Sequence, residues 1–362
     1  MMNKRVSAII CTFIVTVTAA LSACGNSTGA TAPNDNQETV TVVDSIGREV
    51  QVVTNVERIA ALYSFAGYAV CLLESGNSLV GVPGGLQRDI LLVEMFPNIA
   101  NASVPREGGA INIEELLRIK PDVVIIRKDT VTDEKEKEKL DKNGICYIVV
   151  DFTTMAEQME AIQIIGDAIG KSEEARRFNA YFEEVIGRVD GIVGNLEETE
   201  KVRLFHAENQ ATRATHETSL VADWTKAAGV INVSVGQDLK LIGNDYYASI
   251  EQILLWNPEV IIVNETTAYN LILGHPQWSG IRAVRNGKVY QLPNGISRWG
   301  HPGSVETPLA LLWTVKTVYP ELSGDVSIED EVRSFYSTFF NMELDDTMIS
   351  TILKGGDLRE DK

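Results

Sequence analysis

The chain has 362 residues, 44% of them hydrophobic, so it is long enough to form two domains with a sizeable core. Its formal net charge is −18 at pH 7. So acidic a chain is not expected to bind nucleic acid, or anionic lipid through a basic patch. A local basic pocket for an anionic ligand stays compatible with this charge.

The N-terminus has the pattern of a targeting segment. Lys4 and Arg5 precede an apolar stretch, residues 6–20, that is too short to be a comfortable membrane span. The stretch ends in LSAC, whose small residues before Cys24 resemble the lipobox of bacterial lipoproteins, where the cysteine becomes the lipidated first residue. We expect a signal peptide over residues 1–23 and a lipid on Cys24. The alternative is an ordinary cleaved signal with an incidental cysteine.

A polar segment follows the predicted lipidation site. Residues 24–39 are rich in Asn, Ser, Thr, Gly and Ala, a composition typical of a flexible tether. Two further cysteines, Cys71 and Cys146, lie in apolar surroundings. Buried free thiols are expected there, and a disulfide between them is the alternative outside the cell.

The first lobe is predicted to begin with a β-hairpin over Val40–Val53, where apolar and polar residues alternate around a glycine turn. Apolar runs at 59–62, 79–82 and 145–150 predict buried strands. An apolar helix to about Glu74 follows the first of them.

One pattern occurs twice in the chain. INIEELLRIKPDVVII covers residues 111–126, and ASIEQILLWNPEVIIV covers residues 248–263, 137 positions later. Each copy predicts a short amphipathic helix, a proline that ends it, and an all-apolar strand. A strand without polar alternation is typical of a parallel sheet covered on both faces. The repeat therefore predicts two similar α/β lobes.

A long helix is predicted between the two copies. Ser172 is a candidate N-cap, and apolar positions keep helical spacing to about Leu196. About 25 residues at ~1.5 Å each give a rod of roughly 37 Å. The fold class we expect is α/β, with two similar lobes of mainly parallel sheets joined by one long spanning helix. The expected domains are residues 40–152, a helical linker 153–197, and residues 198–362.

The second lobe is predicted to contain strands at 202–206 and 288–292, besides its copy of the repeat. A loop over 293–307 (PNGISRWGHPGSVET) leads into a helix over 308–319, and a last helix covers 328–340.

These features together resemble the substrate-binding proteins of bacterial ABC importers. The lipobox, the opening VTVVDSIGREVQV, the doubled helix–Pro–strand and the single spanning helix are similar to the helical-backbone class (class III), which takes ferric siderophores, haem and cobalamin. The resemblance covers Val40 to the C-terminus. It implies a monomeric, extracytoplasmic receptor that holds its ligand between the lobes and hands it to a permease with its ATPase. It also implies that Glu114 and Glu251 dock onto the permease. The alternative is that each is a first-turn glutamate favoured by the helix dipole.

Ligand contacts are expected outside the carboxyl ends of the strands. Guanidinium groups there suit carboxylate, hydroxamate or oxyanion oxygens. An exposed tryptophan in a Gly- and Pro-rich loop would offer a flat apolar face beside an anion clamp. The residues selected on these grounds are Tyr63, Arg106, Arg127, Tyr246, Arg298, Trp299 and His301.

The ligand expected first is a ferric siderophore-type chelate. Arg127 and Gly84–Gly85 stand where cobalamin-binding relatives tend to carry aromatics, which favours a smaller or more anionic ligand. An oxyanion such as molybdate or tungstate is the second reading, and haem or a corrinoid the third. A bare divalent metal would need converging histidines, for which the candidates are His206, His216, His275 and His301. No resident cofactor, metal site or catalytic residue is expected, since the chain has no GxGxxG after a strand, no GxxxxGK[ST] and no GxSxG.

Overall fold

The computed structural model describes residues 38–356, so the predicted signal peptide and Cys24 lie outside the described residues. Contacts divide the chain into two units, residues 1–35 and 36–362, and both lobes belong to the second unit. Within residues 38–356 no helix is long and apolar enough to cross a membrane.

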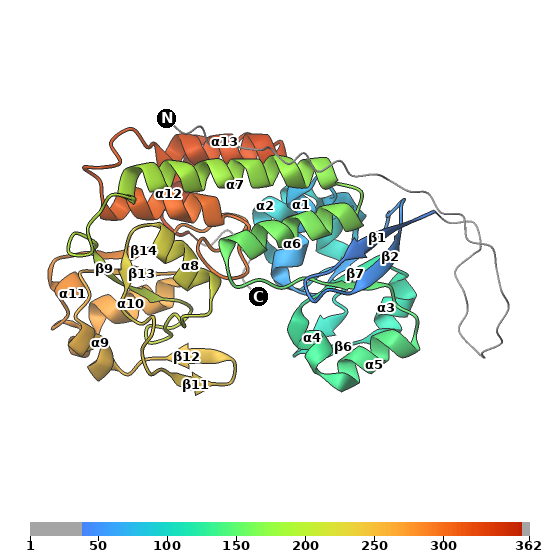
Figure 1. Cartoon of the computed structure of the whole chain (residues 1–362), viewed down its shortest axis with the longest axis horizontal. Coiled ribbons are helices and arrows are strands. Elements are labelled where there is room, and N and C mark those ends of the chain that lie inside the picture. Colours follow the sequence, from blue (N-terminus) through green and yellow to red (C-terminus); the bar gives the residue numbers. More distant parts are fainter. Residues whose placement is uncertain (1–37, 357–362) are drawn as a thin grey trace, which may run out of the picture. The chain divides into compact units, whose positions relative to one another are not determined.

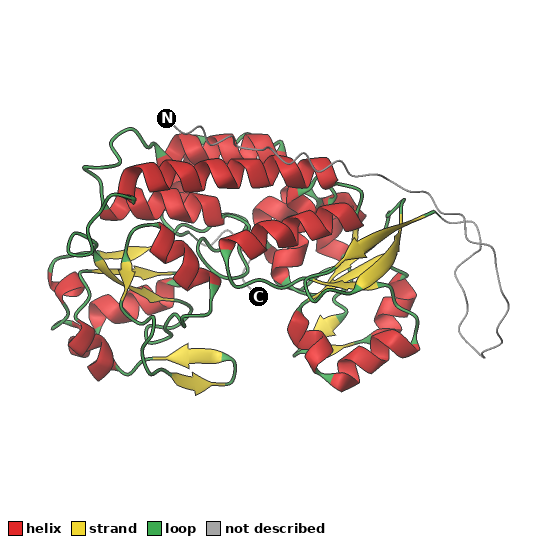
Figure 2. Cartoon of the chain, in the orientation of Figure 1, coloured by secondary structure: helices red, strands yellow, loops and turns green. Residues whose placement is uncertain are grey.

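The first lobe contains one four-stranded parallel sheet in the order β4-β3-β7-β8, with a hairpin β1–β2 and a second small hairpin β5–β6 (Figure 2). Its elements are β1 Thr39–Val43, β2 Glu49–Val53, β3 Ile59–Ala61, α1 Ser64–Leu72, η1 Gly76–Ser78, β4 Leu79–Gly81, η2 Leu86–Arg88, α2 Ile90–Met95, η3 Pro97–Asn101, β5 Arg106–Glu107, β6 Ala110–Ile111, α3 Ile113–Ile119, β7 Val123–Ile126, α4 Lys128–Thr132, α5 Glu134–Lys142 and β8 Tyr147–Val149.

The second lobe contains a parallel sheet of the same topology, in the order β10-β9-β13-β14, with a hairpin β11–β12 before its repeat helix. The linker helices and the elements of this lobe are α6 Met155–Ala168, α7 Ser172–Val193, β9 Arg203–Ala207, α8 Leu220–Ala227, β10 Ile231–Asn232, β11 Lys240–Ile242, β12 Asp245–Tyr247, α9 Ile250–Trp256, β13 Val260–Val263, α10 Thr266–Gly274, η4 Pro276–Trp278, α11 Arg282–Arg285, β14 Val289–Gln291, α12 Thr307–Val318, α13 Ile328–Phe340 and α14 Asp346–Leu353.

Both sheets are buried on both faces, as the all-apolar strand runs predict. In β7, Val123 and Ile125 pack into one hydrophobic core while Val124 and Ile126 pack into another. The strand β13 divides its side chains in the same way. The prediction of two α/β lobes with parallel sheets is therefore confirmed.

The two copies of the repeat fold alike. Helices α3 and α9 have seven residues each and begin after the N-caps Asn112 and Ser249. Each ends at a residue with a left-handed backbone, Lys120 (φ 44°) and Asn257 (φ 46°). The prolines that follow cannot continue a helix, so the chain turns directly into the strand.

The predicted long helix, α7, runs between the lobes within a layer of helices (Figure 1). Helix α7 packs against α6, α8 and α12, and α13 contacts both α12 and α1 of the first lobe. One continuous core, which includes Phe178 and Phe182 of α7, joins residues of both lobes. This packing makes the connection stiffer than a single helix would be.

The expected start of the long helix is off by one residue. The N-cap is Lys171, and Ser172 is the first helical residue, where its hydroxyl bonds to Asp167 at 2.5 Å. The helix ends at Val193, which gives 22 residues and a length of about 33 Å.

Candidate ligand site and docking surfaces

The carboxyl ends of β7 and β8 form a polar edge in the first lobe. Arg127 follows β7 directly, and its Nε lies 3.3 Å from the Oδ1 of Asp151, which comes just after β8. A pocket of about 560 Å³ opens here, lined by Arg127, Lys128, Asp129, Thr132, Asp133 and Asp151. This is the edge where the topology predicts ligand contacts in an α/β sheet.

Arg106 reaches the same edge from the hairpin β5–β6. Its guanidinium lies 3.6 Å from the Oδ1 of Asp129, and its Nε donates to the carbonyl of Gly109. Arg106 and Arg127 therefore reach the same sheet edge from different elements, each beside a carboxylate, Asp129 or Asp151, that lines the pocket.

Tyr63 lies at the end of β3 and turns its hydroxyl toward β8. It donates a 2.8 Å hydrogen bond to the carbonyl of Val150. Burial, with the nearby Asp151 carboxylate, raises the pKa of Tyr63 well above its usual value. The hydroxyl therefore keeps its proton at neutral pH, so the half-buried ring is the part of Tyr63 that can meet a ligand.

The equivalent edge of the second lobe holds two arginines. Arg298 pairs with Glu265, which follows β13, at 2.8 Å. Arg213 lies between two carboxylates, 3.1 Å from Glu208 and 2.8 Å from Asp245. Sequence reasoning missed Arg213, because a polar loop offers no periodic signal that selects one cation.

Glu208 is a buried carboxyl at this edge. Only 5% of its surface is exposed, and burial raises its pKa to about 7 although Arg213 favours the charged form. Beside it, the ring of Tyr246 stacks on His216 with centroids 4.0 Å apart and planes 18° apart. His216 is also within hydrogen-bond distance of the Thr218 hydroxyl, at 2.9 Å.

The expectation that Trp299 is an exposed ligand platform is wrong. Its side chain is fully buried in the core, and its carbonyl accepts a 2.8 Å bond from the Asn264 amide. The loop 293–307 is drawn inward because buried Glu306 accepts bonds from Tyr336 and Ser297. Gly295 allows this approach, since a Cβ there would lie about 2.2 Å from Glu306.

His301, in the same loop, makes a local contact. Its Nδ1 accepts a 3.1 Å hydrogen bond from the backbone N–H of Gly303, so it caps the turn that follows it. His301 is half-buried.

The histidines lend no support to a bare-cation site. His206 is fully buried, its Nε2 lies 2.7 Å from Asn264, and burial lowers its pKa to about 4, so it is neutral and structural. No group of three or more His, Cys, Asp or Glu residues in the described part of the chain could hold a metal ion. Cys71 and Cys146 are free thiols, and Cys146 is only partly buried.

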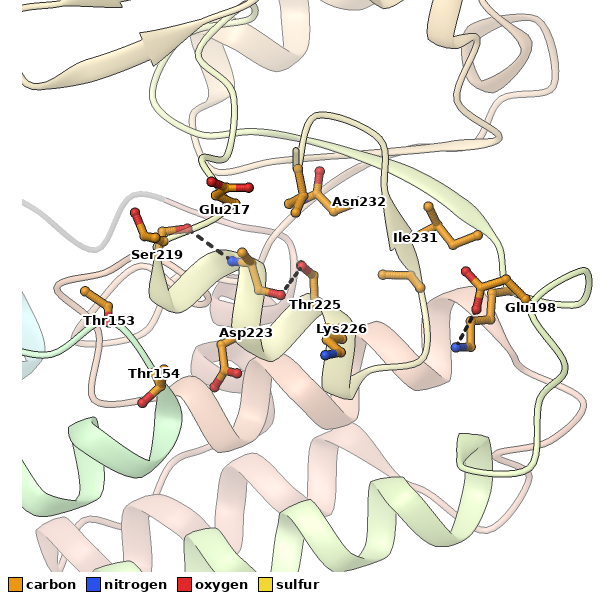
Figure 3. A pocket seen from close by; sticks show the side chains of 15 residues that line it. Thr153, Thr154, Glu198, Glu217, Ser219, Asp223, Thr225, Lys226, Ile231 and Asn232 are labelled. Atoms are coloured by element: carbon orange, nitrogen blue, oxygen red, sulfur yellow. Dashed lines mark hydrogen bonds and ion pairs between the residues drawn. The ribbon is translucent and has the colours of Figure 1, made fainter. Parts of the chain in front are cut away.

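A slightly larger pocket, of about 600 Å³, lies between the linker and the second lobe (Figure 3). Its walls come from the start of α6, from α8 and from the turn into β10, and Glu217, Ser219, Asp223 and Lys226 line it. Asp223 uses one oxygen to accept the N–H of Met155 at 2.8 Å, which ties α8 to the first residue of α6. The pocket therefore lies beside the joint between linker and second lobe.

Glu114 and Glu251 occupy the same position in the two repeat helices. Each is the second residue of its helix, and both are exposed. Hydrogen bonds from its own backbone N–H and from Ser249 lower the pKa of Glu251, so its carboxylate is charged at neutral pH. The neighbouring Glu115 is instead bound by Ser103 and Arg118. Glu114 thus stays available at the surface.

Comparison with known proteins matches this arrangement to one family. The molybdate-binding protein MolA of Haemophilus influenzae is 24% identical over 83% of this chain and 90% of its own length. Its structure with bound molybdate has a TM-score of 0.75 at 21% identity, covering 84% of this chain and 99% of that one.

Two further structures share the fold. A periplasmic solute-binding protein of Veillonella parvula is 25% identical with a TM-score of 0.75, covering 87% of this chain and 97% of its own. CeuE of Helicobacter pylori, solved with Ni(II) bound, is 24% identical with a TM-score of 0.70, covering 87% and 99%. The model of the family described as periplasmic binding protein matches residues 101–295, more than half of the chain. The chain therefore belongs to the periplasmic binding protein family.

Proposed function

We propose that this chain is the lipid-anchored, extracytoplasmic receptor of an ABC importer, and that it captures a metal complex, a ferric siderophore-type chelate. As a member of the family, it is a substrate-binding protein of transport and not an enzyme. Beyond family membership, we propose the identity of the ligand, the lipid on Cys24 and the contacts with the permease.

The observation that carries the ligand proposal is the pairing of arginines with carboxylates on both lobe edges. The pairs are Arg106 with Asp129, Arg127 with Asp151, Arg213 with Glu208 and Asp245, and Arg298 with Glu265. The oxygens of a ligand can accept hydrogen bonds from each guanidinium in place of the carboxylate, so the arginine loses no hydrogen bond. The carboxylates released in this way must then be compensated or hydrated.

This charge balance favours a metal complex over a simple anion. A metal complex brings cationic charge together with its oxygens, so it can satisfy guanidinium groups and carboxylates at once. A small oxyanion adds negative charge to an edge where acids already match the bases. A corrinoid or haem fits less well, because the buried Trp299 offers no flat platform.

An oxyanion is the second candidate ligand. It is supported by the similarity to MolA, which binds molybdate, and by the two arginines at the first-lobe edge. In this reading Arg106 and Arg127 bind the tetrahedral oxygens, and the pairs with Asp129 and Asp151 open.

Calorimetry of the mature protein against a ferric hydroxamate chelate, molybdate, haem and cobalamin separates these candidates. We expect the ferric chelate to bind, and Arg127→Ala and Arg213→Ala each to weaken binding by about tenfold to a hundredfold, because each removes a charge-assisted contact. Arg176→Ala is the matched control, since Arg176 pairs with Glu173 on α7, away from both edges. Binding of molybdate alone would favour the second candidate, and full affinity in both arginine variants would overturn the site.

We also propose that Glu114 and Glu251 contact basic groups of the permease. Two exposed carboxylates at equivalent positions of two lobes make a two-point electrostatic key. Charge reversal at both is expected to abolish uptake and leave ligand capture intact. Loss of capture would contradict the docking role.

A further inference from the structure

Each exposed docking glutamate has an exposed leucine beside it. Leu117 follows Glu114 by three positions, and Leu254 follows Glu251 by three. Residues three apart on a helix share one face. The two leucines are 44% and 38% exposed, whereas the repeat-related apolar pair at the helix ends, Ile119 and Trp256, is buried or half-buried.

Single exposed leucines are ordinary on protein surfaces. What distinguishes Leu117 and Leu254 is that the same residue is exposed at the same position in both lobes, next to the same acid. The aligned sequences are EELL in the first copy and EQIL in the second, so the neighbours differ while Glu and Leu are kept. Core packing does not explain the match, because neither leucine belongs to a hydrophobic core of its lobe.

The two surfaces are unequal one residue further on. Leu255 is 84% exposed, and at the equivalent position the first lobe has Arg118, bound to Glu115 at 2.6 Å. The second-lobe surface thus has two adjacent apolar side chains beside the exposed Glu251. The first-lobe surface has one leucine and an internal ion pair.

We infer that Leu117 in one lobe, and Leu254 with Leu255 in the other, form the apolar half of the permease-docking surfaces, with the second lobe contributing more of the binding. The inference rests on the proposed function, since its occupant is the extracytoplasmic face of the permease. The partner surface it fits has a cation to meet each glutamate and an apolar patch beside that cation. Apolar contacts next to a charge pair exclude water from it and strengthen the pair.

Binding of the mature protein to its permease and ATPase in lipid nanodiscs tests this inference. We expect Leu117→Ala to weaken the complex about fivefold and the double change Leu254→Ala/Leu255→Ala about thirtyfold, as interface truncations of this kind do. Leu322→Ala is the matched control, because Leu322 is 50% exposed in the turn after α12. Capture of a ferric hydroxamate by the isolated variants is expected to stay unchanged.

Glu114→Ala and Glu251→Ala in the same assay separate the two ideas. If both glutamate variants weaken the complex while the leucine variants match Leu322→Ala, the apolar half is wrong and the charge-based docking stands. If the glutamate variants also bind fully, the docking surface lies elsewhere and both ideas fail. A larger effect of Leu117→Ala than of the double change would overturn the assigned order of the lobes.

Discussion

The amino ends of the two sheets are built in the same way. Arg58 directly precedes β3 and Arg203 is the first residue of β9, and each donates to a carbonyl at the end of its repeat helix, Ile119 at 3.0 Å or Trp256 at 3.2 Å. In return, Asp122 and Glu259, which follow the repeat prolines, each accept the arginine's own backbone N–H. These bonds lock helix, proline and strand together in both lobes.

The carboxyl ends of the same strands differ. By strand register, the position after the first strand is Tyr63 in one lobe and Glu208 in the other. Tyr63 donates to a backbone carbonyl, whereas Glu208 meets Arg213. The scaffold has stayed alike where it only supports the fold and has diverged where the loops can meet a ligand.

The largest expected difference between the lobes is in the pH dependence of stability, to which Glu208 contributes in the second lobe. Burial raises its pKa from 4.5 to about 7, so between these pH values the folded chain holds a proton that the unfolded chain has released. Its contribution to stability is therefore highest below about pH 4.5 and is lost as the pH rises toward 7. The shift corresponds to about 3 kcal/mol.

Denaturant unfolding at pH 4.5 and pH 7.5 measures this contribution. Glu208→Gln, which keeps an oxygen for Arg213, is expected to reduce the loss of stability across this range relative to the unchanged chain. Glu306, whose pKa burial also raises to about 7, is present in both proteins and cancels. If the free energy of unfolding changes equally with pH in the two proteins, Glu208 ionises at its ordinary pKa, and the prediction is wrong.

A smaller effect on stability is expected when the arginines at the amino ends of the sheets are replaced. Arg58 makes three bonds to the carbonyls of Ile119 and Lys120, at 2.5–3.1 Å, while Arg203 makes one to Trp256. We expect Arg58→Ala to lower the free energy of unfolding by about 2 kcal/mol and Arg203→Ala by about 1 kcal/mol, since charged donors that satisfy helix-end carbonyls contribute in this range. Equal losses, measured by denaturant unfolding, would contradict the view that the first lobe depends more on this cap.

The fold was predictable from the sequence to the extent that it repeats. The helix–Pro–strand pattern predicts both copies because local signals, a helix face and a proline, decide them. Helix α13 was predicted over Ile328–Phe340, the residues it occupies. The long helix was one residue off at its start, because Ser172 bonds Asp167 and leaves the cap to Lys171.

The site was less predictable, because tertiary contacts decide it. The Gly- and Pro-rich composition of the loop 293–307 is typical of exposed loops, yet bonds to Asn264, distant in the sequence, and to the buried Glu306 hold the loop and Trp299 in the core. Arg213 gave no local signal at all; the hairpin β11–β12 that supplies Asp245 makes it a candidate. Arg127 could be selected because a charge directly after a buried strand needs a partner.

The central claim is that both lobe edges share one ligand, and anomalous diffraction from crystals grown with a ferric hydroxamate chelate tests it most directly. We expect a single iron peak, with Arg127 of the first lobe and Arg213 of the second lobe both in contact with the chelate. A peak in the pocket lined by Asp223 and Lys226, or at one lobe edge alone, would contradict it.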